Sequence, residues 1–159
     1  MKKKLLVCVM ALAAGFVVTG CDKKENNNNG VETTTTAAQD VSLVCEVSNN
    51  DEKVKITVVF ANDAIKKATF TNTEKFATEK EAKKEHEDNS AEFMEALKNK
   101  GMTGSISDSG TLVTRSVTFT VADLDDKAKV YYDEMFGEIK DKKYDDTKSY
   151  LETAGYTCK

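Results

Sequence analysis

The hydrophobic positions along this chain follow three patterns, one after another. Residues 5–18 form an almost unbroken apolar run, whereas residues 22–40 hold few apolar side chains. From Val41 onward apolar and polar residues alternate, first with a period of two and later also with helical spacing. A period of two is typical of half-buried strands, and spacings of three and four are typical of amphipathic helices. The third part is therefore predicted to hold the folded domain.

Strand-like alternation dominates the start of this predicted domain. Apolar side chains occupy every second position in residues 41–47 and 54–60, and the turn-forming residues 48–51 separate the two runs. A second turn at residues 61–63 precedes a third expected strand at residues 65–71. Because the connections are short, we expect these strands to pair as an antiparallel meander.

A helix is expected next. Thr78 and Glu81 fit a capping box, in which each side chain accepts a hydrogen bond from the other residue's backbone N–H. The side chains that follow with helical spacing form one stripe: Ala82, His86, Ser90, Phe93 and Leu97. A basic last turn with Lys98 and Lys100, followed by Gly101, is predicted to end the helix.

Two further strands and a second helix are predicted after Gly101. Residues 102–106 and 112–121 indicate a hairpin, because a Ser, Asp and Gly turn separates them. Asp123 is expected to cap a helix that runs through Phe136.

The chain is expected to end with a short helix and a short strand. Asp145 or Asp146 is predicted to start this helix, which ends at Gly155, and residues 156–158 form the last strand. The prediction for residues 41–159 is a single α+β domain: an antiparallel sheet of five or six strands with two or three helices packed on one face.

The first twenty residues indicate an export signal. Three lysines at positions 2–4 precede the apolar run, which as a helix would rise only about 21 Å against a bilayer core of about 30 Å. Its length suits the apolar part of a signal peptide rather than a membrane span. A short buried helix of the fold is disfavoured by the lysines before the run and the polar residues after it.

Residues 18–21, with the sequence Val-Thr-Gly-Cys, resemble the lipobox of bacterial lipoprotein signals. The resemblance implies that diacylglycerol is attached to Cys21, that the chain is cut after Gly20, and that Cys21 becomes the new N-terminus. A simple cleaved signal and a retained anchor are the alternatives. Asp22 resembles the inner-membrane retention signal of some double-membraned bacteria and would have no such role in a cell with one membrane.

Lipidation would hold the domain on the outer side of the cell membrane. Two acyl chains suffice for stable attachment, and residues 21–40 would serve as the lipidated end and a flexible tether spanning about 20–25 Å. Loss of residues 1–20 removes three lysines and no acid, so the net charge changes from −4 to −4 − 3 = −7. Such an acidic protein is not expected to bind nucleic acid.

The remaining cysteines predict a disulfide. Cys8 lies in the discarded leader and Cys21 carries lipid, which leaves Cys45 and Cys158 as a pair in an exported domain. Each lies in a predicted strand, so we expect these two strands to be neighbours. Two buried free thiols are the alternative.

Few side chains in this sequence point to catalysis or to a metal site. The only histidine, His86, lies in the apolar stripe of the first predicted helix and is interpreted as a core-edge residue bonded to a neighbour. The acidic runs 123–126 and 145–146 are interpreted as helix caps rather than metal ligands. Arg115, the only arginine, shares a strand face with apolar residues and needs an anionic partner. An internal salt bridge is favoured for it over contact with an anionic ligand.

No sequence signature of an enzyme is present. A glycine-rich phosphate loop, a Gly-x-Ser-x-Gly elbow and a Cys-x-x-Cys pair are all missing, and no metal or other cofactor is expected.

From Cys45 to Gly155 the chain resembles the YehR-like family of small bacterial lipoproteins. The resemblance rests on the strand pair within residues 54–70, on Thr78-Glu79-Lys80-Glu81-Ala82 at the start of the helix, on residues 101–109, and on Val117-Thr118-Phe119 before Asp123. It implies a compact α+β domain on an exported lipoprotein, and it supplies no catalytic residues.

The leading hypothesis is therefore a non-enzymatic, lipid-anchored module that binds an unidentified protein or small molecule, or that supports the envelope. The alternative is an enzyme or enzyme subunit whose carboxylates come together in a pocket formed only by the fold.

Overall fold

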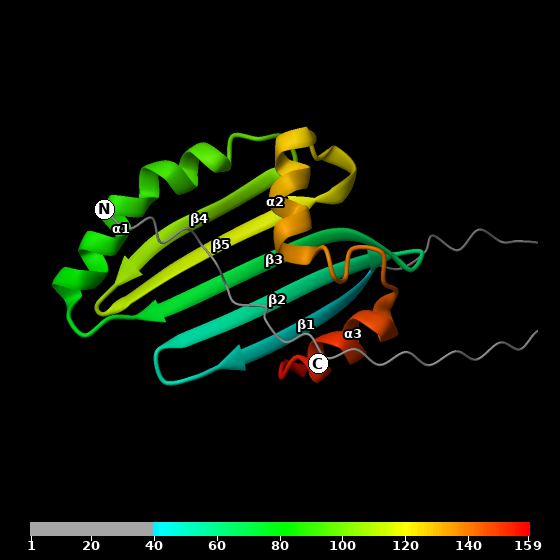
Figure 1. Ribbon diagram of the computed structural model, residues 1–159, viewed down its shortest axis with the longest axis horizontal. Coiled ribbons are helices and arrows are strands. Elements are labelled where there is room, and N and C mark those ends of the chain that lie inside the picture. Colours follow the sequence, from blue (N-terminus) through cyan, green and yellow to red (C-terminus); the bar gives the residue numbers. More distant parts are fainter. Residues whose placement is uncertain (1–39) are drawn as a thin grey trace, which may run out of the picture. The chain divides into compact units, whose positions relative to one another are not determined.

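The domain is one antiparallel sheet with helices on one side. The computed structural model describes residues 40–159. Its strands are β1 (Val41–Ser48), β2 (Glu52–Ala61), β3 (Ala64–Lys75), β4 (Met102–Ser109), β5 (Leu112–Thr120) and β6 (Thr157–Cys158). The helices are α1 (Glu79–Ala96), the 3-10 turn η1 (Val121–Asp123), α2 (Asp126–Phe136) and α3 (Tyr144–Thr153). The strands lie in the order β4-β5-β3-β2-β1-β6 (Figure 1), which confirms the predicted α+β fold.

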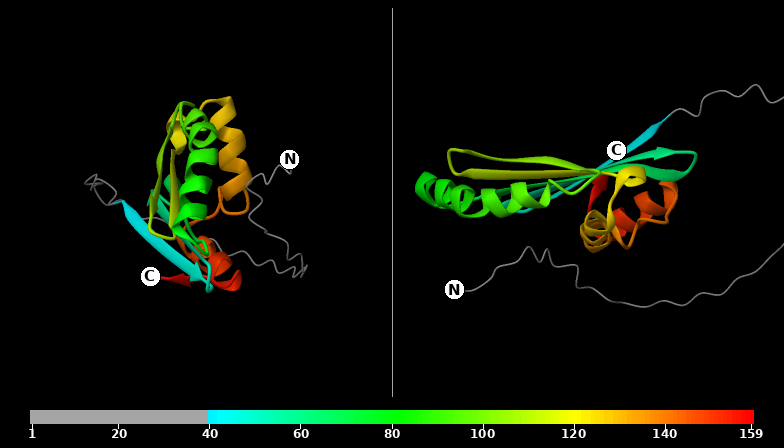
Figure 2. Two further views of the ribbon diagram at one scale, coloured as in Figure 1. Left: turned by 90° about the vertical axis from the view of Figure 1, so that its left-hand side faces the viewer. Right: turned by 90° about the horizontal axis from the view of Figure 1, so that it is seen from above.

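Strict alternation along the central strands separates the two faces of the sheet. In β2 every second side chain from Val54 to Phe60 is buried, and in β5 the same holds from Val113 to Phe119. All three helices cover the face on which these side chains lie, and the opposite face is open (Figure 2). Periodicity therefore identified the buried face correctly.

The helices complete the core over one half of the sheet. Tyr132 and Phe136 of α2 pack against Phe119 of β5, with ring centroids 5.6 and 5.8 Å from that ring. Leu151 of α3 belongs to the same cluster as Leu43 of β1. At the first helix, Thr78 and Glu81 form the predicted capping box, which satisfies two backbone N–H groups.

Several predicted boundaries were wrong, mostly because hydrogen bonding continues past the apolar pattern. The third strand runs on to Lys75, because its polar residues pair with β5 as far as Leu112. The hairpin strand β4 likewise extends to Ser109. The first helix ends at Ala96, so the basic residues after it lie in the following turn and not in the helix.

The predicted starts of the second and third helices also need correction. Asp123 lies in η1, and the cap of α2 is Asp125, whose carboxylate accepts from the N–H of Ala128 at 2.8 Å. Helix α3 starts at Tyr144, which places Asp145 and Asp146 within its first turn, where the helix dipole still favours negative charge. Within residues 40–159, no helix combines the length and the apolar character needed to cross a bilayer.

Candidate functional site

The two ends of the described chain are joined by a disulfide. Cys45 of β1 and Cys158 of β6 lie directly opposite each other in the sheet, with Cα atoms 4.0 Å apart, and their sulfurs are bonded. This confirms the predicted pairing of terminal strands. Cys21 and the cleavage site after Gly20 lie outside the described residues, so they stay predictions.

Arg115 is held by two glutamates from different elements. Its side chain is 9% exposed; one guanidinium nitrogen donates to Glu74 of β3 at 2.5 Å and the other to Glu85 of α1 at 2.6 Å. The favoured interpretation of an internal salt bridge is therefore confirmed. These bonds tie helix α1 to the sheet through charge-assisted contacts.

Beside Arg115 lies a second buried polar side chain that the sequence did not single out. Asn72 of β3 pairs with Arg115 across the ladder and is 5% exposed. Its Nδ2 donates to Glu52 Oε1 at 3.0 Å, whereas its Oδ1 has no donor among the described residues. A buried acceptor without a donor is costly, so this amide oxygen stands out within the fold.

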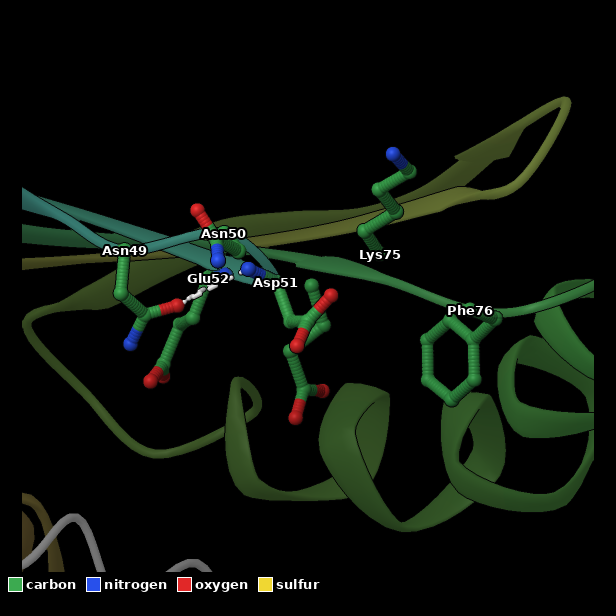
Figure 3. Close-up of a pocket in the computed structure, with 7 residues that line it drawn as sticks. Asn49, Asn50, Asp51, Glu52, Lys75 and Phe76 are labelled. Carbon is green, nitrogen blue, oxygen red and sulfur yellow. Dashed lines mark hydrogen bonds between the residues drawn. The ribbon is translucent and has the colours of Figure 1, made fainter.

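Glu52 and Glu74 belong to an open pocket of about 420 Å³ at one end of the sheet. Glu52 pairs with Glu74 across the ladder, and both lie next to the turn between β1 and β2. Figure 3 shows the side chains of Asn49, Asp51, Glu52 and Phe76 on one side of the strands and Lys75 pointing the other way. The full lining is Asn49, Asn50, Asp51, Glu52, Glu74, Lys75 and Phe76.

The backbone around this pocket is fixed by short hydrogen bonds. Asn49 Oδ1 accepts from the N–H groups of Asp51 and Glu52, at 2.9 and 2.8 Å (dashed in Figure 3). The N–H of Lys75 donates to the carbonyl of Asp51 at 2.7 Å, which joins the turn to the end of β3. The carboxylates are therefore presented by an ordered frame.

The charge of the pocket is negative. Glu74 is paired with Arg115, but neither Asp51 nor Glu52 has an ion-pair partner among residues 40–159. The alternative hypothesis from the sequence is an enzyme whose carboxylates come together only in the folded protein. Three carboxylates line this pocket: Asp51, Glu52 and Glu74.

The other acidic and histidine candidates have structural roles. The backbone N–H groups of Ala128 and Lys100 hold the pKa of the Asp125 carboxyl below its usual value, as expected for a helix cap. His86 contacts Asp108 of β4 through Nδ1, which fits its interpretation as a residue bonded to a neighbour. Within the described part of the chain, no three His, Cys, Asp or Glu side chains are grouped to bind a metal.

The open face of the sheet is rich in hydroxyl groups that bond to each other. Thr69, Thr71 and Thr73 of β3 each lie within 3.1 Å of a hydroxyl on β5. The partner hydroxyls belong to Thr118, Ser116 and Thr114. Each of these six hydroxyl groups therefore has a hydrogen-bond partner within the sheet.

The pocket could not be found from the sequence because its lining comes from two separated segments, residues 49–52 and 74–76. Residues 49–52 have turn chemistry, whereas Glu74 and Lys75 lie in the part of β3 that was not predicted and Phe76 directly follows it. A local signal did exist for the two buried polar side chains that bond to Glu52 and Glu74: Asn72 and Arg115 occupy inward positions in strands whose other inward residues are mostly apolar.

Comparison with known proteins identifies the fold. The sequence matches no protein-family model and no curated protein sequence. The solved structure of the YehR protein of Escherichia coli is similar, with a TM-score of 0.56 and 19% identity, over 77% of this chain and 93% of that chain. A solved structure of a protein from Streptococcus pneumoniae TIGR4 is similar with a TM-score of 0.53 and 10% identity, over 92% of this chain and 100% of that chain.

At such low identities the likeness concerns the fold alone. It confirms the resemblance noted in the sequence at that level, and the described domain has a YehR-like α+β fold.

Proposed function

We propose that this chain is a lipoprotein anchored through diacylglycerol on Cys21, and that its extracytoplasmic domain is a non-enzymatic binding module. The anchor rests on the leader and the lipobox-like residues 18–21. The binding role is supported by one observation above all: an open pocket with two carboxylates that no cation neutralises within the described chain.

The position of the pocket fits an anchored binding protein. The predicted tether enters the domain at Val41, the first residue of β1, whereas pocket residue Asn49 directly follows the end of that strand. Eight residues of extended strand span about 25 Å. The pocket therefore lies one strand length from the point where the predicted tether attaches. At that distance a ligand outside the membrane has access to the pocket.

Lipidation predicts a specific loss on substitution of Cys21. In cells fed an alkyne-labelled fatty acid, the wild-type chain should carry the label and begin at Cys21. Cys21→Ala should carry none and remain uncut, because the thioether cannot form. Cys8→Ala is the matched control and should behave like wild type. Label on Cys21→Ala, or a mature N-terminus elsewhere, would contradict the anchor.

Binding at the pocket predicts a position-dependent crosslink. A photoreactive amino acid at Asn50, on the pocket lining, should give an adduct of defined mass in intact cells, seen on gels or by intact-protein mass spectrometry. The same group at Glu46, on the open face of the sheet, is the control and should give none. Glu52→Gln should abolish the Asn50 adduct, and equal adducts from both positions would count against the pocket.

An enzyme remains the second candidate, because Asp51, Glu52 and Glu74 line one pocket. A binding role is favoured over catalysis because two of these carboxylates already accept hydrogen bonds from neighbouring side chains. Glu74 is taken up by Arg115 and Glu52 accepts from Asn72, so both serve as hydrogen-bond acceptors. Chemical change of the crosslinked molecule by the wild type, lost in Glu52→Gln, would establish the enzyme instead.

A further inference from the structure

We propose that the free edge of strand β4 docks an extended peptide segment of a partner protein, which adds to the sheet as a further antiparallel strand. The docked segment alternates polar and apolar side chains and includes a basic residue. Strand β4 contributes no residue to the pocket lining. Docking at β4 therefore does not depend on binding at the pocket.

The outer edge of β4 carries backbone groups without partners. Strand β4 is the outermost strand on its side of the sheet (Figure 1). The N–H of Thr120 donates to the carbonyl of Gly101 at 2.8 Å, which fixes the phase of the ladder. Because antiparallel ladders alternate, Gly104, Ile106 and Asp108 turn their N–H and C=O groups away from β5. These outward groups make no hydrogen bond to any element of the described domain.

This edge lacks most of the features that protect edge strands from pairing. Lysines, prolines, bulges and very short strands are the common means of protection. Strand β4 has eight residues, contains no lysine or proline, and pairs with β5 without a bulge. Its one charged side chain, Asp108, is engaged by His86 of α1. A long edge of free N–H and C=O groups is complementary to the backbone of one extended strand.

Helix α1 forms a wall beside this edge. It runs alongside β4 (Figures 1 and 2), on the face of the sheet to which the Asp108 side chain points. His86 of α1 contacts Asp108 near the end of β4, whereas the carbonyl of Asn99, just after α1, accepts from the N–H of Met102 at the start of β4. The helix and the strand therefore run in opposite directions, so positions along one can be matched to positions along the other.

An exposed methionine of α1 lies on the side of the helix that faces the free edge. Glu85 bonds to β5 and His86 contacts β4, so Met94, about 80° beyond His86 around the helix, is turned further toward the edge. Met94 lies about 12 Å along the helix from His86. Gly104 lies about 13 Å along the strand from Asp108. Met94, which is 48% exposed, is therefore level with Gly104, where β4 has no side chain.

These surroundings define the side chains of the docked segment. Opposite residues of an antiparallel pair point to the same face, so the side chains opposite Gly104 and Ile106 face α1. An apolar side chain opposite Gly104 would pack on Met94 and occupy the space that the glycine leaves. On the other face the segment meets the exposed Ser105 and Ser107, where threonines would continue the hydroxyl pairs seen between β3 and β5.

Charge favours a segment of a partner protein over a second copy of this chain. Helix α1 has seven acidic residues and three lysines, a net charge of 3 − 7 = −4. Pairing of β4 with β4 of a second copy about a twofold axis would bring two such helices to the same face, where they would repel each other. A lysine opposite Asp108 would instead be attracted to this acidic surface.

The test is a titration of the ¹⁵N-labelled full chain in a neutral detergent, followed by NMR and amide exchange. The probe is the acetylated and amidated peptide Thr-Lys-Thr-Val-Thr-Leu-Thr, whose lysine, valine and leucine would lie opposite Asp108, Ile106 and Gly104. In the free protein the amides of these three residues should exchange rapidly. Saturating peptide should slow their exchange about tenfold or more, with little change at residues 103, 105 and 107, which already bond to β5.

Matched peptides and variants locate the binding. The same peptide with N-methyl groups on its lysine, valine and leucine keeps every side chain but loses the backbone donors, so it should give no saturable shift. Met94→Ala should weaken binding about tenfold, because the side chain that packs on the leucine is lost. Val130→Ala removes another exposed apolar side chain, on α2, and should change the affinity less than about twofold.

Several results would overturn docking of a peptide at β4. They are the absence of saturable shifts with the unmodified peptide, equal binding of the N-methylated peptide, slower exchange elsewhere than at Gly104, Ile106 and Asp108, and equal affinity of Met94→Ala and wild type. Protection of these amides in the free protein that increases with protein concentration would assign the edge to a second copy instead.

Discussion

Loss of the Cys45–Cys158 bond should lower the free energy of unfolding by about 4–5 kcal/mol. The two cysteines are 113 residues apart in sequence, so the bond closes nearly the whole described domain into a loop. Breaking the bond raises the conformational entropy of the unfolded chain, because that chain is no longer closed into a loop, and this stabilises the unfolded state. Urea unfolding of the oxidised and the reduced wild-type protein measures the difference without deleting an atom.

The local structure indicates which part is released first. Strand β6 has two residues, and its pairing with β1 is continued only by the two backbone bonds between Val44 and Lys159. Without the disulfide, β6 should lose amide protection before the central strands do. Cys158→Ser is the control, because reductant should not destabilise this variant further. Equal stability of oxidised and reduced wild type would contradict the prediction.

The sheet could be predicted from the sequence because its signals are local. Alternation in residues 54–60 marks one buried face, the Thr78 and Glu81 pair marks a helix start, and the export signal predicted from the sequence favours a disulfide between Cys45 and Cys158. Each of these inferences needs only neighbours in the chain or the compartment in which the protein folds.

The pocket and the position of the caps depended on tertiary structure. Asp123 and Asp125 are equally good caps by composition, and the turn η1 decides between them. Glu74 and Glu85, the partners of Arg115, lie 41 and 30 residues away from it in the sequence, so no local sequence pattern could identify them. Its need for some partner was nevertheless predictable from its place among apolar side chains.

Removal of Arg115 should produce the second large effect, about 2–3 kcal/mol of lost stability in Arg115→Met. Loss of one partner from a fully buried ion pair costs about 3–5 kcal/mol, because the other charge stays behind. Here Glu74 and Glu85 are 38% and 36% exposed, so water can solvate them partly and the cost is smaller. Urea unfolding measures the change.

A matched substitution separates this effect from loss of charge alone. Lys53 pairs with Glu46 at 2.9 Å on the open face, with both side chains more than 40% exposed, so Lys53→Met should cost less than about 1 kcal/mol. The double variant Arg115→Met with Glu85→Gln should recover part of the loss, because only Glu74 then remains charged. In Arg115→Met, amide exchange should rise at helix α1, since the bond to Glu85 joins that helix to β5. A loss no greater than that of Lys53→Met would show that the buried arginine does not fasten helix and sheet.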